Sequence, residues 1–507
     1  MAAADALSPN RYGEVKGNSM SATNHMSASK WRLFEKYARG QMASPISSPD
    51  TITPRPTDRP ARLSVAQQEF CSQETNSPGI PPLYNESIMV RMKGSLDVSI
   101  LERSFAEIIR RHEIWRTTYV KRDRQLVQII RLPEETFRLS IQDFRGMSES
   151  ERMNEMRKFM DRCTRRPFNF ERGPLLRASL LQMSTEDHVL FIVAHLSIVD
   201  GVSVYQILPT ELAVLYEAFS AGRNSPLPEL PVQFADFADW QREHLDSHKW
   251  GNQIAFWKKQ LDRPPVLNWP RDHTRQAVTK TFRGMIRSFA FSNELTEQIK
   301  YLSRGSGVTL FITLLAGFAA LLHLYTDGTD IVIGTFSPSG RQRAEVQTLM
   351  GHFINPVALR LHPRDSLTFR ELMHHARDIT AEAMRHDLVP LQTLIHEITG
   401  LPTSGRNPFF KFGISLQPPM PSIAYDWTVS SMDAQSGGAP WNLYVAFIDR
   451  PTGMLGRVQY DPDVFQESNV EQMWSGLQNL LKMAASHPDE YLSGLRSELR
   501  TAFQSSP

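Results

Sequence analysis

Apolar residues recur along the chain with two alternating periods, one typical of helices and one of strands. The segment 99–117 has apolar residues at helical spacing, with Leu101, Phe105 and Ile108 on one face. The segment 188–194, HVLFIVA, is a short and almost continuous apolar run, which predicts a central strand covered on both faces. Helix and strand patterns alternate through both halves of the chain, and this order predicts an α/β fold built from two layers.

The same patterns predict the other main elements. Further helices are expected at 202–222, 308–326, 366–387 and 469–487. Further strands are expected at 124–130, 330–336, 409–417, 441–449 and 454–461. Pro209 is predicted to kink the first of these helices, and Gly222 to end it. A Pro- and Trp-rich stretch near 220–270 predicts a connection between two lobes, residues 61–240 and 241–507.

Residues 1–60 differ from the rest because they are rich in Ser and Pro and poor in aliphatic residues. Such a segment buries too little surface to offset its ordering entropy, so we predict a disordered tail. One island, near 29–40, predicts a short helix that Ser29 caps and that carries Trp31 and Phe34 on one side. This helix either packs on the body of the protein or docks on a partner.

Composition and charge exclude several classes of protein. The 507 residues include 56 Lys and Arg against 54 Asp and Glu, a net charge of +2, which argues against a nucleic-acid or anionic-membrane binder. The longest apolar stretch, 310–325, falls short of a membrane span. Cys71 and Cys163 are too few for a disulfide scaffold or a Cys-based zinc module. Without a signal-peptide pattern, the expected location is the cytoplasm.

His195 is the strongest candidate for chemistry in a chain that lacks common catalytic motifs. There is no G-x-S-x-G, P-loop, G-x-G-x-x-G or H-E-x-x-H pattern, and we expect neither a metal nor a bound cofactor. His195 follows the buried strand 188–194 and precedes Asp200-Gly201 and a helix. A partly desolvated histidine beside a cleft is neutral and can accept a proton. On these residues alone, a structural role for His195 is the more frequent alternative.

A series of segments resembles the motifs of nonribosomal peptide synthetase condensation domains, in the chloramphenicol-acetyltransferase-like superfamily. AHLSIVDGVS, residues 194–203, resembles the active-site motif HHxxxDG. Seven other segments resemble motifs of the family and follow in the same order: 63–70, 111–119, 165–180, 234–243, 331–360, 385–394 and 405–410. The resemblance extends over about residues 60–490 and depends on many motifs rather than on one.

The resemblance implies a fold and a reaction. The fold is a V-shaped pseudo-dimer of two acetyltransferase-like lobes, with a tunnel at the seam that phosphopantetheine arms enter from two sides. The reaction joins an acyl thioester on a carrier protein to an amine or hydroxyl, in nonribosomal peptide or hybrid polyketide biosynthesis. The implied partners are acyl or peptidyl carrier proteins in trans, with a small-molecule amine or alcohol as another acceptor. We assign the second motif histidine, the base or positioning group, to His195.

The resemblance also assigns roles to other residues. Asp200 is expected to be structural and to pair with Arg341, and Gly201 matches the motif glycine. Arg111 and His112 are expected to be structural. Four residues are candidates for the wall of the substrate channel: Ser203, Asn355, Asn407 and Trp441.

Three departures from the family pattern leave alternatives open. We place Ala194 at the first motif histidine, Pro356 where Thr is common, and Asn442 where Asp is common. The chain is therefore a condensation-type acyltransferase, an O-acyltransferase that releases an ester, or a silent condensation-like module that binds carriers or recruits a partner. No adenylation domain or carrier motif is visible before Pro507, which predicts a freestanding protein or an excised segment.

Overall fold

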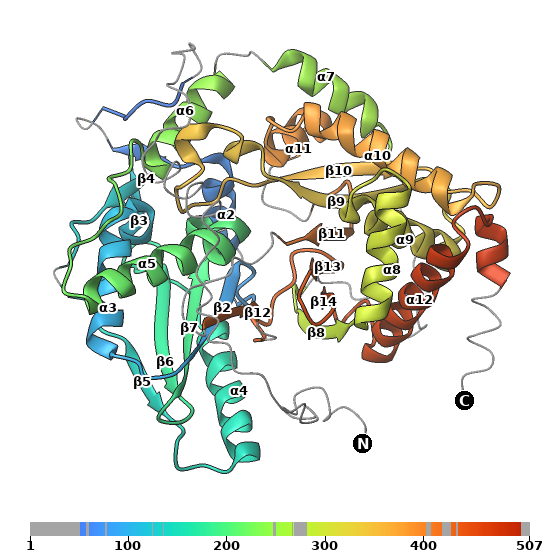
Figure 1. Ribbon diagram of the computed structural model, residues 1–507. Helices are drawn as coiled ribbons and strands as arrows, with labels where there is room; N and C mark the ends of the chain where they lie inside the picture. Colours follow the sequence, from blue (N-terminus) through green and yellow to red (C-terminus); the bar gives the residue numbers. More distant parts are fainter. Residues whose placement is uncertain are drawn as a thin grey trace. The chain divides into compact units, whose positions relative to one another are not determined.

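Figure 1 shows a computed structural model of the chain, which describes residues 51–56, 60–76, 79–123, 125–134, 136–246, 250–265, 267, 281–401, 407–417, 427–431 and 434–497. The helix predicted near 29–40 lies outside the described residues. The end of the predicted tail is ordered, because Ile52 is buried and Arg55 Nη1 donates to Asp236 Oδ1 at 2.8 Å. Residues 51–56 therefore pack on the first lobe instead of being disordered.

A five-stranded sheet forms the centre of the first lobe (Figure 1). Its strands, in spatial order, are β12 (Trp427–Ser431), β2 (Asn85–Lys93), β7 (Asp187–His195), β6 (Leu176–Gln182) and β5 (Ser140–Asp143). The apolar run predicted as a central strand is β7, which pairs antiparallel with β2 and β6 and is buried along nearly its whole length. A smaller sheet contains β1 (Ala61–Arg62), β4 (Gln125–Ile130) and β3 (Thr117–Arg122).

The helices of the first lobe include the two predicted ones, and the predicted helix 99–117 ends earlier, at Arg111, before a 3₁₀ turn, Glu113–Arg116. They are α2 (Val65–Asn76), α3 (Val98–Arg111), α4 (Glu149–Arg165), α5 (Leu208–Ser220) and α6 (Phe234–Asp246). The predicted helix 202–222 is a π-helical turn, Ser203–Ile207, followed by α5. Pro209 lies in the first turn of α5, directly after the π-helical turn, where its missing N–H removes no hydrogen bond of that helix. Gly222, with a φ of +68°, lies just beyond the helix end.

A six-stranded sheet forms the second lobe. Its strands, in spatial order, are β10 (Asn355–Leu361), β9 (Ile331–Ser337), β11 (Phe412–Leu416), β13 (Leu443–Ile448), β14 (Leu455–Tyr460) and β8 (Met285–Ala290). Its helices are α7 (Gly251–Gln260), α8 (Asn293–Gly305), α9 (Leu310–Thr326), α10 (Phe369–Arg385), α11 (Leu391–Thr399) and α12 (Glu467–Ser486). The predicted helices at 308–326, 366–387 and 469–487 are confirmed as α9, α10 and α12. Among the described residues no single helix has the length and apolarity to cross a membrane; α8 and α9 have them only together, as a pair bent by 105°.

The second half of the chain contributes two segments to the core of the first lobe. β12 pairs antiparallel with β2, so a strand from residues 427–431 extends the first sheet. The turn before β10 packs Val346, Leu349 and Phe353 into the same apolar core as β7. A single boundary at residue 240 therefore does not separate the two cores, and the turn before β10 brings residues of the second half to the loop after β7.

Candidate functional site

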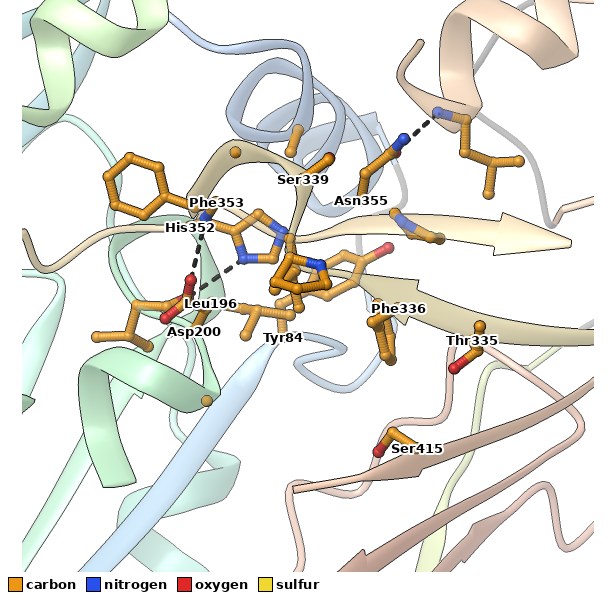
Figure 2. A pocket seen from close by; sticks show the side chains of 18 of the residues that line it. Tyr84, Leu196, Asp200, Thr335, Phe336, Ser339, His352, Phe353, Asn355 and Ser415 are labelled. Atoms are coloured by element: carbon orange, nitrogen blue, oxygen red, sulfur yellow. Dashed lines mark hydrogen bonds between the residues drawn. The ribbon is translucent and has the colours of Figure 1, made fainter. Parts of the chain in front are cut away.

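A cavity of about 560 Å³ lies between the end of β7 and the sheet of the second lobe (Figure 2). The first lobe contributes Leu196 and Gly201 to its wall, and the second contributes Thr335, Asn355 and Trp441. The volume is typical of a small-molecule site. Among the described residues, no group of His, Cys, Asp or Glu side chains could hold a metal ion.

Asp200 and Arg341 form a buried, bidentate ion pair beside the cavity. Arg341 Nε donates to Asp200 Oδ2 at 2.8 Å, and Arg341 Nη2 donates to Asp200 Oδ1 at 2.7 Å. Burial raises the pKa of the Asp200 carboxyl, but the Arg341 guanidinium, the Ser203 amide and His352 together lower it further, so the pKa lies below its usual value. Arg341 Nη1 also donates to the Leu349 carbonyl at 3.0 Å. The pair therefore fixes the loop after β7 to the turn before β10.

Ser203 completes this network and does not line the cavity. Its side chain is buried, and Ser203 Oγ donates to Asp200 Oδ1 at 2.9 Å. Ser203 Oγ also accepts from the Gly351 amide at 3.0 Å, and the Phe353 amide donates to Asp200 Oδ2 at 3.2 Å. We predicted Ser203 as a channel residue; the structure gives its hydroxyl a structural role, because its hydrogen bonds are all made inside the protein.

The ring of His195 is sealed in the first lobe. The residue is 0% exposed and is absent from the cavity wall. Phe170 meets the ring edge-on at a centroid distance of 5.0 Å, and Phe70, Tyr84 and Phe168 surround it at 6.2 Å. An aromatic enclosure of this kind keeps solvent and substrates away from the imidazole.

Both nitrogens of His195 are directed at protein groups. Nδ1 accepts from the Ser197 amide at 3.2 Å, so the ring proton lies on Nε2. Nε2 lies 3.6 Å from Glu74 Oε2 and has no hydrogen-bond partner. Burial raises the pKa of the Glu74 carboxyl, but the His195 ring and two backbone amides lower it further than burial raises it. His195 therefore orders the turn after β7 and anchors it to α2.

The position of the motif needs a correction by one residue. In HHxxxDG three residues separate the second histidine from the aspartate, so counting back from Asp200-Gly201 places the two histidines at 195 and 196. His195 is then the first motif histidine, and Leu196 replaces the second. The structure agrees with this count, because Leu196 lines the cavity whereas His195 and Ala194 are buried. A register counted from Asp200 alone would have found this in the sequence.

His352 is the imidazole that does line the cavity, and our sequence reasoning missed it (Figure 2). Its Nδ1 lies 3.2 Å from the Val199 carbonyl, which has only acceptor capacity, so Nδ1 donates. The Phe70 ring meets the imidazole edge-on at 5.0 Å. Burial lowers the pKa of His352 to about 4, against an opposing effect of Asp200. The signal was present in the sequence, since GHFINP places a histidine inside a family motif that we had matched.

The other three channel candidates lie in the cavity wall, and they differ in how far the protein already engages their side chains. Asn355 Nδ2 donates to the carbonyls of Asp387 and Val389, both at 2.8 Å, and so holds the fold together. Asn407 Oδ1 accepts from the Phe409 amide at 2.8 Å, whereas its buried Nδ2 has no hydrogen-bond partner.

Trp441 forms an aromatic part of the same wall. It stacks on Phe336 at a centroid distance of 5.2 Å and meets Tyr444 edge-on at 5.2 Å. A Cβ on Gly413 would lie 1.9 Å from the Trp441 ring, so glycine is required for the indole to lie on β11.

Arg111 and His112 belong to a separate buried cluster. His112 Nε2 lies 2.9 Å from Glu211 Oε2, and Arg111 Nη2 donates to Glu211 Oε1 at 3.2 Å. The Met350 amide donates to His112 Nδ1 at 3.2 Å. This cluster supports the turn before β10 from behind, away from the cavity wall.

Comparison with known proteins agrees with this architecture. The family model described as condensation domain matches residues 61–500. A linear gramicidin synthase of Brevibacillus parabrevis is 35% identical over 91% of this chain, and phosphinothricin tripeptide synthetase PhsC of Streptomyces viridochromogenes is 31% identical over 92%. The chain spans only 9% of the gramicidin synthase and 43% of PhsC.

Solved structures show the same two-lobe fold. The SgcC5 protein from Streptomyces globisporus superposes with a TM-score of 0.72 at 26% identity, covering 85% of this chain and 100% of that one. The X-domain from teicoplanin biosynthesis superposes with a TM-score of 0.73 at 22% identity, covering 87% and 99%. The fold is thus the two-lobe, chloramphenicol-acetyltransferase-like fold of acyltransferases. The chain belongs to the condensation domain family of nonribosomal peptide synthesis.

Proposed function

We propose that this protein is a condensation-type acyltransferase, which joins a carrier-bound acyl thioester to an amine or hydroxyl acceptor. The observation that carries the proposal is the cavity of about 560 Å³ lined by both lobes. Two substrates held there react as if in one molecule, and this orientation alone contributes on the order of 7–11 kcal/mol in favourable cases.

The chemistry needs no cofactor bound to this protein. The acceptor nitrogen or oxygen attacks the thioester carbonyl, the carbon–sulfur bond breaks, and the thiol leaves on the phosphopantetheine arm of its carrier. Carrier proteins are therefore the proposed partners, and the acyl group arrives already attached. The predominantly aromatic and aliphatic surface near Trp441 and Phe336 suits an apolar part of a substrate.

The test is turnover with loaded carriers. The protein is incubated with an acyl-loaded carrier and a panel of amines and alcohols, and products are followed by mass spectrometry. Ser415→Trp places an indole in the cavity wall and is expected to abolish transfer. Ser140→Trp, on the exposed edge strand β5, is the matched control and should retain it. Equal turnover in both variants would contradict catalysis in this cavity.

A second candidate is a silent module that binds carriers or recruits a partner enzyme. It is favoured by one observation: an aliphatic side chain, Leu196, occupies the second motif position, while His195 is sealed away from the cavity. Carrier binding in titration experiments, together with no transfer to any acceptor, would select this function. Amide or ester product would exclude it and would also identify the acceptor class.

A further inference from the structure

The loop after β7 offers no proton acceptor to the cavity. Leu196 lines the wall at the second motif position, and a hydrocarbon side chain cannot take a proton. The neighbouring Asp200 carboxylate is engaged by two guanidinium nitrogens of Arg341 and two backbone amides. An enzyme that deprotonates an acceptor in this cavity needs a base from another element.

The turn before β10 places an imidazole beside this gap. His352 lines the cavity, and its Nδ1 donates to the carbonyl of Val199, three residues after Leu196. Figure 2 shows Leu196, Asp200 and His352 gathered at one end of the cavity. The imidazole and the motif loop thus share one part of the wall, although they are far apart in the sequence.

The backbone on both sides of His352 is fixed to the motif loop. The Gly351 amide donates to Ser203 Oγ at 3.0 Å, and the Phe353 amide donates to Asp200 Oδ2 at 3.2 Å. The edge-on contact with Phe70 limits the rotation of the ring. These contacts hold the imidazole in one orientation, which is what a base needs if it is to meet a reacting group without prior rearrangement.

The hydrogen bond to Val199 also selects the tautomer. With the proton on Nδ1, the lone pair of the neutral ring lies on Nε2. Burial keeps the pKa of the ring below its usual value, so the ring is neutral at neutral pH. The charged and titratable groups around it are Asp200, which favours the protonated ring, and His195, which disfavours it.

We propose that His352 Nε2 is the general base of this protein and serves in place of the missing second motif histidine. The inference rests on the proposed acyl transfer. As the acceptor attacks the thioester carbonyl, its N–H or O–H proton passes to Nε2, the new carbon–nitrogen or carbon–oxygen bond forms, and the carbon–sulfur bond breaks. The imidazolium then returns the proton to the leaving thiolate, which gives a free thiol and a neutral His352.

The central test is His352→Asn, because the Asn amide can donate to Val199 as Nδ1–H does but has no basic nitrogen. Turnover of acyl-carrier with an amine acceptor is expected to fall on the order of 10²–10⁴-fold, with unchanged carrier binding and melting temperature. The matched control is His362→Asn, at the far end of β10, where the side chain is 42% exposed and lies near Asp330; it should keep wild-type turnover.

A second variant separates loss of the base from loss of structure. Leu196→His restores an imidazole at the second motif position. In the His352→Asn background it should raise turnover at least tenfold above that of His352→Asn alone. The His352→Asn defect should also shrink with a more acidic acceptor, such as a hydroxylamine, which needs less help to lose its proton.

The outcomes distinguish the inference from the proposed function. Wild-type turnover in folded His352→Asn would overturn the role of His352 and leave acyl transfer intact. Absence of turnover in the wild-type protein, with every acceptor tested, would overturn the proposed function and the inference with it.

Discussion

His195 and Leu196 are neighbours in the chain, yet they face different environments at the end of β7. The His195 ring lies in an enclosure of aromatic rings, with Ser197 and Glu74 at its two nitrogens. Leu196 faces the cavity, as does His352 from another element. Successive residues of an extended chain point to opposite sides, so a shift of one position exchanges a core residue for a cavity residue. At such a site, the way the motif is aligned with the sequence decides which residue faces the cavity.

The largest expected effect concerns the ion pair that holds both environments in place. Asp200→Asn leaves Arg341 charged and without its carboxylate in a buried site, and is expected to lower the free energy of unfolding by about 3–5 kcal/mol. Urea unfolding measures the change. The exposed pair Arg91–Asp187 is the control, since Asp187→Asn should cost less than about 1 kcal/mol. Similar losses in both variants would show that the buried pair does not hold the loop.

The second effect separates a structural His195 from a catalytic one. His195→Ala empties an aromatic enclosure and removes the acceptor of the Ser197 amide, so it should lower the free energy of unfolding by about 2–4 kcal/mol. Turnover per folded molecule should change by less than about threefold, because the ring does not reach the cavity. A loss on the order of 100-fold in turnover at unchanged stability would instead identify His195 as the base. The contrast between a buried His195 and a cavity-facing Leu196 would then be wrong.

The third effect is on the pH dependence of stability. Because burial lowers the pKa of His352 to about 4, the unfolded chain binds a proton between pH 6.5 and 4 that the folded protein does not. This group therefore gives full stability above about pH 6.5 and loses on the order of 3 kcal/mol as the pH falls to 4.

The measurement compares wild type with His352→Asn by urea unfolding at pH 7 and pH 5. Asp200, whose pKa is lowered, stays ionised over this range in both proteins, so its contribution cancels. The wild type should lose more stability than the variant. An equal loss of stability between pH 7 and pH 5 in both proteins would show that the His352 ring is protonated at the same pH in the folded and unfolded states.

The smallest effect is expected at Asn407, in the cavity wall. Asn407→Asp keeps the acceptor for the Phe409 amide but removes the unpartnered Nδ2 donor. Because Nδ2 is shielded from the cavity, we expect kcat and KM within about twofold of wild type, and a loss of stability on the order of 1 kcal/mol, since the carboxylate oxygen in its place has no donor. A several-fold rise in KM would instead show that a substrate reaches this amide.

Much of the fold was predictable because strong periodic patterns reflect burial directly. The helices α9, α10 and α12 and the central strand β7 appear close to their predicted bounds. β12 was not predicted, because its five residues pair with a strand more than 300 positions earlier and nothing local signals such a partner. The break before α5 was also missed, since a π-helical turn keeps nearly the same apolar pattern as a helix.

The site residues were predictable only where each residue was assigned to the correct position of the motif. Asp200 and Arg341 were expected to pair, and they form a bidentate contact in the structure. The assignment of His195 depended on a register that was one residue off, and the spacing to Asp200 would have corrected it. The sequence placed His352 inside a matched motif, but its position beside the motif loop required the three-dimensional fold, because the turn before β10 packs into the core of the first lobe.

Strand β12 has a practical consequence for any attempt to dissect this protein. Expressed alone, residues 51–246 would leave the outer edge of β2 without its neighbour and would lack the apolar turn that carries Phe353. A sheet edge whose backbone N–H and C=O groups are unpaired can pair with another chain and so promotes aggregation. Chimeras that transplant the first lobe into another condensation domain should therefore carry residues 338–353 and 427–431 with it, or supply them as a complementing fragment.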